Sequence, residues 1–283
     1  MNAALELRDF LDRHARLAVL TGAGISTTSG IPDYRDENGD WKHAKPMQFA
    51  EFKGTLAGRQ RYWARSFTGW RRMSGAAPNA AHRALTALEA AGRLTRTITQ
   101  NVDGLHSRAG SRRVIDLHGR LDRVVCIDCG WGQTRPEWQA ELERRNPAWD
   151  PAVREFRPDG DAVLVDEDES RFRVPDCPAC GGIVKPDVVF FGENVPPERV
   201  RLSLAAIEAA DALLVIGSSL MVYSGLRFPR YAERLGKPVA ILNRGRTRAD
   251  ELASLRLDAD CVATLEGALE HPPDGLPGQR KNR

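Results

Sequence analysis

Short apolar or β-branched runs recur along the chain, and most of them end in glycine or a small polar residue. Runs of this kind are typical of parallel strands that are buried on both faces of a sheet. They occupy residues 17–21, 95–99, 114–117, 212–216 and 239–242. A further apolar segment, residues 188–191, runs into Gly192.

Helical patterns alternate with these runs. Pro78 and Asn79 stand at the start of residues 79–91 and are typical of the beginning of a helix. Gly92 follows the segment and is a typical stop signal. The apolar stripe of this segment comprises Ala84, Leu85, Leu88 and Ala91. Residues 200–210 repeat the pattern, with Leu204 and Ile207 on one face. Strands that alternate with helices predict an α/β fold, a doubly wound parallel sheet covered on both faces.

Two stretches interrupt this rhythm and predict a second, smaller module. One contains "RQRYWARSFTGWRR", and the other contains two cysteine pairs and a long polar loop. We therefore expect a large domain from residues 1–42, 78–118 and 188–283. A helical insertion, 43–77, and a metal-binding insertion, 119–187, would form the small module. The tail, residues 271–283, is expected to lack regular structure.

The first strand leads into "VLTGAGISTTSGIPDYRDENGDW", residues 19–41. Gly22 and Gly24 after a strand allow backbone N–H groups to approach a pyrophosphate. Thr27 stands where the dinucleotide fingerprint G-x-G-x-x-G has its third glycine, and Gly30 comes later. The segment after it resembles a long exposed loop rather than a crossover helix. This favours a nucleotide site that is not of the usual dehydrogenase type, and a plain tight turn is the alternative.

The cysteines form two C-x-x-C pairs, Cys126 with Cys129 and Cys177 with Cys180. Four thiolates in two knuckles suit a tetrahedral zinc ion, and a closed set of four leaves no position for catalysis. The alternative is four unrelated thiols. The fifth cysteine, Cys261, lies in a mostly apolar stretch and is expected in the core rather than as a nucleophile.

Polar residues follow several of the predicted strands and would converge on one crevice. Gln100, Asn101 and Asp103 follow one strand, and His118 follows the next. A histidine at such a strand end can serve as a general base. His106 is expected on a turn, where a structural role is the simpler interpretation. Small polar groups that can bond a ribose or an adenine follow two further strands, at Ser218, Ser219 and Asn243.

Composition narrows the class of protein. The chain has 283 residues, 42% hydrophobic and 28% charged, as in ordinary globular proteins. Its net charge is 41 − 38 = +3, with basic residues scattered, which argues against a zinc-ribbon protein that binds nucleic acid. No apolar run approaches the roughly 20 residues of a membrane span, and we see no signal peptide. A cytoplasmic protein without membrane association is the expectation.

Together, these motifs resemble those of the sirtuins. "GAGISTTSGIPDYR", "TQNVDGLH", "LHG" at His118, both cysteine pairs, "KPDVVFFGE", "GSSLMVYSG" and "ILNRG" occur in the family's order over nearly the whole chain. The resemblance implies a Rossmann-like domain, a structural zinc and NAD as a co-substrate that is cleaved rather than reduced. It also implies a protein lysine deacylase that releases nicotinamide and passes the acyl group to ADP-ribose.

The resemblance also implies roles for individual residues. His118 would deprotonate a ribose hydroxyl, with Asn101 and Asp103 beside it as catalytic residues. The implied NAD contacts are Gly22, Ala23, Gly24, Thr27, Asp33, Tyr34, Arg35, Trp41, Gln100, Asn101, Val102, Asp103, Gly217, Ser218, Ser219, Asn243, Arg244, Gly245 and Cys261. The implied substrate contacts are Tyr62, Arg65, Val188, Phe190 and Gly192, of which the last three would run beside an acyl-lysine peptide as an added strand.

Within the family, "RQRYWARSFTGW", "AGSRR", "PDGD" and the long loop between the cysteine pairs resemble class II, the branch of the fourth mammalian sirtuin. The loop, residues 144–173, would then reach toward the acyl channel. Tyr62 and Arg65, three residues apart on one helix face, resemble a pair that binds an acyl carboxylate. The alternative for this pair is a packing tyrosine and a solvated arginine.

We therefore expect acidic or bulky acyl groups to be preferred over acetyl. Mono-ADP-ribosyl transfer to protein and non-catalytic NAD sensing are the alternative functions. A monomer is expected, and the expected partners are acyl-lysine proteins.

Overall fold

A six-stranded parallel sheet forms the centre of the larger part of the molecule. The computed structural model describes residues 2–269, so the tail at 271–283 lies outside the described residues. The strands are β1 Leu17–Thr21, β2 Leu94–Thr99, β3 Val114–Asp116, β9 Ala212–Ile216, β10 Val239–Leu242 and β11 Leu255–Leu257. Their order is β11-β10-β9-β1-β2-β3, with every neighbouring pair parallel. The chain moves outward from β1 in one direction and from β9 in the other, which creates a switch point between them.

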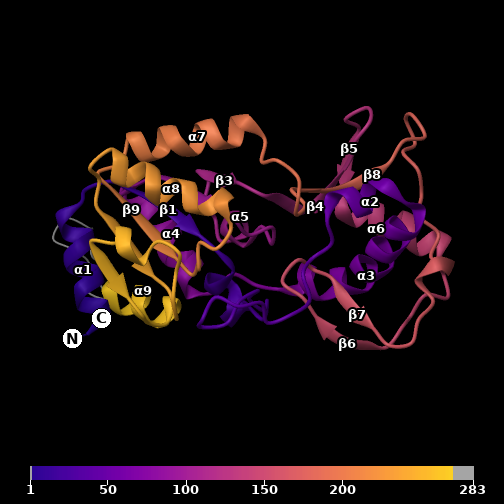
Figure 1. Cartoon of the computed structure of the whole chain (residues 1–283), viewed down its shortest axis with the longest axis horizontal. Helices are drawn as coiled ribbons and strands as arrows, with labels where there is room; N and C mark the ends of the chain where they lie inside the picture. The colour runs from indigo at the N-terminus through magenta and orange to yellow at the C-terminus, as the bar shows by residue number, and fades with distance from the viewer. Residues whose placement is uncertain (1, 270–283) are drawn as a thin grey trace, which may run out of the picture.

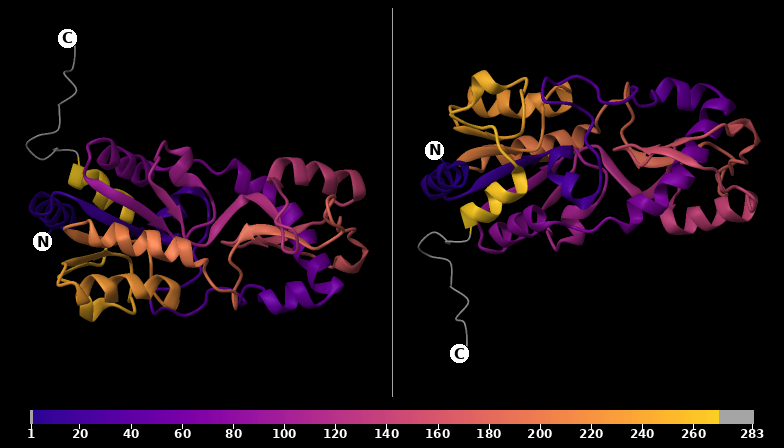
Figure 2. Two further views of the ribbon diagram at one scale, coloured as in Figure 1. Left: turned by 90° about the horizontal axis from the view of Figure 1, so that it is seen from above. Right: turned by 90° about the horizontal axis from the view of Figure 1, so that it is seen from below.

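Helices cover both faces of this sheet, as Figures 1 and 2 show. Because side chains alternate along a strand, Leu17 and Val19 pack on one face, while Ala18 and Leu20 pack on the other. The first face is covered by α1 Ala3–Arg13, α4 Ala80–Ala90 and α9 Cys261–Leu269. The second is covered by α7 Pro197–Glu208 and α8 Tyr223–Arg234. The predicted doubly wound α/β fold is confirmed.

A smaller module lies at the other end of the molecule from the N-terminus (Figure 1). Its sheet has the order β5-β4-β8 and is antiparallel, and a separate antiparallel pair joins β6 and β7. These strands are β4 Gly119–Cys126, β5 Gly132–Thr134, β6 Val153–Phe156, β7 Ala162–Leu164 and β8 Val184–Val188. The helices here are α2 Phe49–Gly54, α3 Leu56–Gly75 and α6 Arg135–Arg145. Trp63, Trp138 and Phe172 are buried in the core that they share.

Short helical turns complete the described chain. They are η1 Ala23–Ser29, α5 Leu105–Arg108, η2 Glu169–Arg171 and η3 Asp250–Leu252. Residues 30–41, after η1, contain no helix, as predicted, although most of this loop is buried or half-buried rather than exposed.

The predicted helices and the segment 188–191 show where the sequence pattern is informative. Helix α4 begins after Asn79, whose side chain accepts hydrogen bonds from the N–H groups of the first turn, as predicted. Helix α7 begins at Pro197, three residues before the predicted start. Residues 189–191 lie outside any strand, because the strand there is β8, which ends at Val188 and pairs antiparallel with β4. Lys185 and Pro186 interrupt the apolar pattern of that strand.

The border between the two parts is a short stretch of paired backbone. The chain crosses to the small module twice, first for α2 and α3 and then between Gly119 and Val188, and these last two residues are direct partners in the β4–β8 ladder. None of the helices within residues 2–269 is long and apolar enough to cross a membrane.

Candidate functional site

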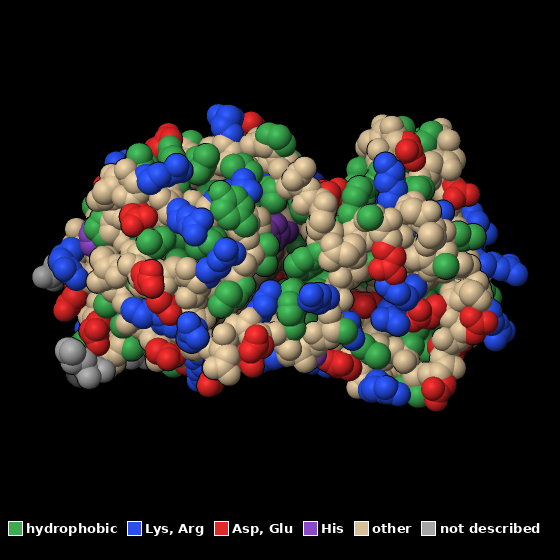
Figure 3. Space-filling model, in the orientation of Figure 1, with side chains coloured by type: hydrophobic (Ala, Val, Ile, Leu, Met, Phe, Trp, Pro, Cys, Tyr) green, Lys and Arg blue, Asp and Glu red, His purple; other side chains and the backbone are tan. Residues whose placement is uncertain are grey.

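A cavity of about 230 Å³ lies between the carboxyl edge of the large sheet and the small module. The space-filling view shows the surface hollowed between the two parts (Figure 3). Most of the predicted site residues line this cavity. They are Gly22, Ala23, Gly24, Asp33, Tyr34, Arg35, Trp41, Tyr62, Arg65, Gln100, Asn101, Val102, Asp103, His118, Val188, Phe190, Gly217, Ser218, Ser219, Asn243 and Arg244.

The loops after β1 and β9 meet backbone to backbone at the switch point. The Gly24 N–H donates to the Gly217 carbonyl at 2.8 Å. A Cβ on Gly22 would lie 2.7 Å from Gly217 O, and one on Gly24 would lie 2.8 Å from Gly217 Cα. Neither position has room for a side chain, so glycine is needed for this close approach. The result is a smooth backbone surface at the end of the two central strands.

Asn101 and Asp103 are held in place by the glycine loop. The Asn101 amide donates to Gly22 O and to Ser26 Oγ, both at 3.1 Å. The Ser26 hydroxyl donates to Asp103 Oδ2 at 2.8 Å, and the Leu105 N–H donates to Asp103 Oδ1 at 2.9 Å. Burial raises the pKa of the Asp103 carboxyl, and these hydrogen bonds oppose the increase. The three side chains therefore form one connected group at the base of the cavity.

His118 lies just beyond β3, with both ring nitrogens hydrogen-bonded. Nδ1 is 3.0 Å from the Gln100 carbonyl oxygen, so Nδ1 carries the proton and donates it. Nε2 lies 2.9 Å from Ser224 Oγ, and in the neutral ring it accepts from that hydroxyl. Burial lowers the pKa of His118 to about 4. The ring is therefore neutral at physiological pH, with its lone pair at Nε2.

His106 is part of the core, as the simpler interpretation predicted. It is buried on α5, with Nε2 at 2.9 Å from Thr21 Oγ1. Its ring packs against His82, with the ring centroids 4.8 Å apart. Burial lowers the pKa of His106 to about 3 and that of His82 to about 4.

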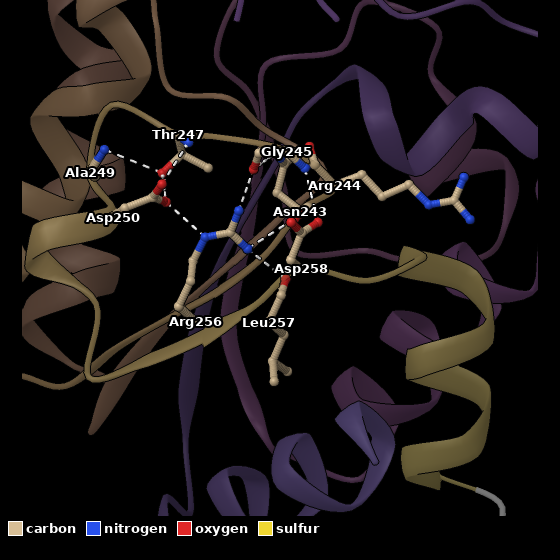
Figure 4. Close-up of polar contacts among 9 residues, drawn as sticks. All are labelled: Asn243, Arg244, Gly245, Thr247, Ala249, Asp250, Arg256, Leu257 and Asp258. Carbon is tan, nitrogen blue, oxygen red and sulfur yellow. Dashed lines mark hydrogen bonds and ion pairs between the residues drawn. The ribbon is translucent and has the colours of Figure 1, made fainter. Parts of the chain in front are cut away.

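The far end of the crevice is the loop after β10, where Asn243 and Arg244 line the cavity. Figure 4 shows that Arg256, on β11, supports this loop from below. Its guanidinium donates to Asn243 O at 2.9 Å and also to Gly245 O. Its Nε donates to Asp250 Oδ1 at 2.7 Å. One side chain therefore fixes the path of the loop through several of its carbonyl groups.

Tyr62 and Arg65 lie on one face of α3 and both line the cavity, as their spacing predicted. The Tyr62 ring packs on Phe190, with the centroids 5.2 Å apart. The Arg65 guanidinium is not free, because its Nε donates to Glu169 Oε1 at 2.5 Å and its Nη1 lies 3.9 Å from Asp161 Oδ2. The predicted pairing of this arginine with a ligand carboxylate therefore competes with two carboxylates of the chain itself.

Four of the predicted residues are not among those that line the cavity, namely Thr27, Gly192, Gly245 and Cys261. The Thr27 hydroxyl donates to Gly24 O at 3.1 Å and thereby acts within its own turn. Cys261 is buried in the core beneath β10, with its sulfur 3.7 Å from Leu242 O. Burial raises the pKa of this thiol to about 12, as expected of a core cysteine rather than a nucleophile.

Other residues of the cavity were not singled out from the sequence. Ser26 lies within the quoted glycine loop, so its position was a usable signal. Arg157, Asp159 and Asp161 come from the loop between β6 and β7, which the sequence placed near the acyl channel only as a segment. Leu220 follows the predicted serines and has a φ of 57°, an uncommon backbone conformation for leucine.

The four cysteines converge at the edge of the small module, away from the cavity. Their sulfur atoms all lie within 4.8 Å of one another. Cys126 and Cys180 are 3.6 Å apart, and Cys129 and Cys177 are 3.8 Å apart. Sulfurs bound tetrahedrally to zinc at 2.3 Å are about 3.8 Å apart. The thiolate set and its spacing fit one structural zinc ion.

A doubly wound sheet, a glycine loop at its switch point and a neutral histidine in the same crevice define a nucleotide-using enzyme of the Rossmann type. The chain belongs to the Sir2 family, whose sequence profile, described as "Sir2 family", matches residues 22–224. An NAD-dependent protein deacetylase of Xanthomonas campestris pv. campestris is 57% identical over 270 residues, which is 95% of this chain and 92% of that protein.

Solved structures of Sir2 proteins share the fold. One, of Sir2 with a p53 peptide and NAD+, has a TM-score of 0.75 at 31% identity and covers 94% of this chain and 96% of its own. Another, of Sir2 with a deacetylated p53 peptide and 3′-O-acetyl ADP-ribose, has a TM-score of 0.77 at 32% identity, with 96% and 99% covered.

Proposed function

We propose that this chain is an NAD-dependent protein lysine deacetylase. The observation that carries the proposal is His118, a neutral histidine fixed as the Nδ1–H tautomer in the crevice where a doubly wound sheet binds its ligand. Its relatives bear the name of this activity, and similar Sir2 structures hold NAD+ and acetylated or deacetylated peptides. NAD supplies the electrophilic ribose carbon, and the acyl group ends on ADP-ribose.

In this reaction His118 is the general base. Its Nε2 lone pair, which accepts from Ser224 in the structure, would accept the proton of a ribose hydroxyl instead. The Gln100 carbonyl holds Nδ1–H and stabilises the ring when it becomes protonated. Because burial lowers its pKa, His118 releases the proton readily after each turnover.

The remaining polar groups would position the nucleotide. Asn101 and Asp103 would contact the nicotinamide and its ribose, since they lie at the base of the cavity next to the glycine loop. The narrow backbone at Gly22 and Gly24 suits a pyrophosphate, because no side chain projects there. The other proposed contacts of NAD are those named from the sequence, with Ser218, Ser219 and Asn243 on the adenosine side.

An acyl-lysine peptide would bind beside Val188 and Phe190. The Val189 N–H donates to the His118 carbonyl at 2.8 Å, which places this segment directly next to the base. An extended peptide pairing here would bring its lysine into the cavity. Gly192 would lie along the same segment, outside the cavity itself.

We propose that the two parts of the molecule are separate domains with different roles. Residues 1–42, 78–118 and 188–283 would bind NAD, and residues 43–77 with 119–187 would form the small module. The separate cores of the sheet and of the module support this division. The four cysteines would hold a structural zinc that fixes the module's strands.

We further propose a place in class II of the family, the branch of the fourth mammalian sirtuin. The support is the long segment between the cysteine pairs, part of which lines the cavity. We also propose a monomeric, cytoplasmic enzyme. Its cysteines are all unpaired, as expected in a reducing compartment, and four of them are available for the metal. The preference for acidic or bulky acyl groups rests on the sequence alone, and the ion pairs of Arg65 with Glu169 and Asp161 oppose its acidic part.

The test is nicotinamide release from NAD with acyl-lysine peptides, comparing wild type with His118→Ala. We expect release that requires an acyl peptide and falls by at least about a hundredfold in His118→Ala, the usual range for loss of a general base. His14→Ala is the matched control, because His14 ends α1, does not line the cavity, and its ring bonds Phe10 O.

Two other outcomes would name another function. Transfer of labelled ADP-ribose to protein that survives His118→Ala would establish a mono-ADP-ribosyltransferase. Binding of NAD without release of nicotinamide for any acyl peptide would establish an NAD sensor.

A further inference from the structure

One end of the cavity carries two carboxylates from the loop between β6 and β7. Asp159 and Asp161 line the cavity together with Tyr62 and Arg65. The Asp161 N–H donates to Asp159 Oδ1 at 3.2 Å, so the two residues share one tight turn. Burial raises the pKa of the Tyr34 hydroxyl, and the nearby Asp159, Asp103 and Asp161 raise it further, so Tyr34 lies between this end and the reaction centre.

The position of this turn is built into the helix beneath it. Strand β7 packs on α3 (Figure 1). Gly69 of this helix faces the turn. A Cβ on Gly69 would lie only 2.0 Å from the carbonyl oxygen of Gly160. Any side chain at Gly69 would push the turn, and both carboxylates with it, away from the helix. The carboxylates therefore occupy the cavity wall by specific packing and not as a loose surface loop.

Two arginines lie near this turn, and only Arg65 forms ion pairs with carboxylates among the described residues. Arg65 bonds Glu169 and lies 3.9 Å from Asp161, and all three side chains are at most 25% exposed. Arg157, which also lines the cavity, lies near Asp159 and Asp161 and lowers the pKa of both. The carboxyl groups of Asp159, Asp161 and Glu169 therefore outnumber the two guanidinium groups here.

The other cations of the cavity do not change this balance. Arg61 is paired with Glu51 and Arg244 with Asp260, while Arg35 donates to Gly39 O and Lys45 is exposed to solvent. Burial and the neighbouring Asp159 raise the pKa of Asp161 to about 8. A place where the chain's own carboxylate resists ionisation is a poor place for an additional one.

Two polar atoms at this end have no partner among the described residues. They are Asp161 Oδ1, an acceptor, and Arg157 Nε, a donor, and both are buried. Buried polar atoms are nearly always hydrogen-bonded in folded proteins, so these two are available to a ligand. An uncharged end group with both a donor and an acceptor, such as a carboxamide or a hydroxyl, would satisfy both.

We infer that this end of the cavity selects acyl groups that are uncharged, with a polar end that can donate a hydrogen bond, and that it discriminates against acyl groups ending in a carboxylate. This inference rests on the proposed deacylase function and on Tyr62 and Arg65 marking the acyl end. Discrimination arises because a carboxylate at Arg157 Nε, the one donor left open here among the described residues, would also lie beside Asp159 and Asp161.

The test compares two peptides that differ only at the end of the acyl chain, succinyl-lysine and its amide counterpart, succinamoyl-lysine. We expect wild type to release nicotinamide with a kcat/KM at least about tenfold higher for the amide. Equal values, or a higher value for succinyl-lysine, would overturn the inference. Acetyl-lysine is run in parallel, and no release with acetyl or any other acyl peptide would instead contradict the proposed function.

Variants then test whether the carboxylates cause the preference. The double variant Asp159→Asn/Asp161→Asn should reduce the amide-to-acid ratio at least about fivefold. Asp166→Asn is the matched control, since Asp166 is exposed on the same segment, and it should keep the wild-type ratio. Gly69→Ala offers a second route, because it displaces the turn without changing any charge and should also reduce the ratio. If the amide-to-acid ratio is unchanged in a folded double variant, these carboxylates are not the source of the preference.

Discussion

The behaviour of His118 illustrates how much of the site is determined at the level of single residues. Nothing in the side chain itself separates it from the other histidines of the chain. Its Nδ1 faces a carbonyl, which fixes the tautomer, and its burial fixes the charge. His106 is also buried and neutral, but its ring bonds a core threonine and does not line the cavity. The surroundings of each ring therefore separate a base from a packing residue.

The pKa of His118 predicts the acid limb of the rate profile. A base is active when unprotonated, so kcat/KM for NAD should be flat from neutral pH to about pH 5. It should fall only as the pH approaches about 4. Initial rates with an acetyl-lysine peptide between pH 4 and 8 would check this. A break near pH 6.5, the ordinary value for histidine, would contradict the assignment.

The buried pair His82 and His106 predicts a loss of stability in acid. In the unfolded chain both titrate near 6.5, and in the folded chain near 4 and 3. The pair contributes no pH dependence above about 6.5. Below it the unfolded state binds more protons, so unfolding becomes more favourable as the pH falls from 6.5 to 4. The slope is about tenfold in the unfolding constant per pH unit for each histidine.

Urea unfolding between pH 4 and 7.5 would measure this slope, with the double variant His82→Gln/His106→Gln as the comparison. The variant should be less stable at neutral pH but should lose less stability in acid. Parallel curves for wild type and variant would show that other groups cause the acid effect.

At the scale of elements, the loop after β10 depends on a neighbour rather than on its own residues. Asn243 turns its amide onto its own loop, at 2.6 Å from Arg244 O, so it does not fix the loop to the rest of the fold. Arg256 on β11 does so (Figure 4), together with Asp258, whose Oδ1 accepts from the Gly245 N–H at 3.0 Å. Since the guanidinium bonds several carbonyl groups at once, a lysine cannot replace all of its contacts.

We therefore expect Arg256→Gln to raise the KM for NAD roughly tenfold, because the adenosine loop loses its support. The kcat should change much less, since His118 and its partners lie on other strands. Arg256→Lys should give an intermediate KM. Steady-state kinetics at varied NAD would separate the two constants, and a fall in kcat with unchanged KM would refute this role.

The elements also show what the sequence pattern could predict. The strands β1, β9 and β10 are continuous apolar runs buried on both faces, so they were visible. Because parallel strands all point in one direction, the convergence of the polar residues that follow them at one crevice could also be predicted. Strand β8 was hidden by Lys185 and Pro186, and helix α8 by Gly225 and Pro229. In both cases tertiary packing overrides local preference.

The acyl end of the site was beyond sequence reasoning for a related reason. Tyr62 and Arg65 could be placed on one helix face by their spacing. The contact of Arg65 with Glu169 spans 104 residues, and the position of Asp161 depends on the bare backbone at Gly69. No local pattern reports contacts of this kind.

At the scale of the whole molecule, the cavity has walls from both parts and depends on the small module being ordered. The cysteine cluster joins the ends of β4 and of the segment that leads to β8, the two strands that border the large sheet. Loss of the metal should therefore reach the cavity, although the cluster does not line it.

We expect one zinc per chain, and we expect Cys129→Ser to lose most of it, together with acyl-peptide-dependent nicotinamide release. The melting temperature should fall as well. Cys261→Ser is the matched control, because Cys261 is outside the cluster and its replacement should leave the zinc content at one. Metal analysis of the purified proteins and thermal unfolding would check both. Full activity in metal-free protein would contradict a structural role for the zinc.

The pairing of Gly119 with Val188 has a consequence for how such enzymes diversify. Because the polypeptide departs from the large sheet and returns to it at adjacent points, everything between them forms a closed excursion. The segment that carries Asp159 and Asp161 lies wholly inside that excursion, whereas His118 and the glycine loop lie outside it. Evolution can therefore replace the segment that contacts the acyl group and keep the residues that cleave NAD. A chimera that carries residues 120–187 of a relative should acquire the acyl preference of that relative. It should retain the NAD chemistry of this chain.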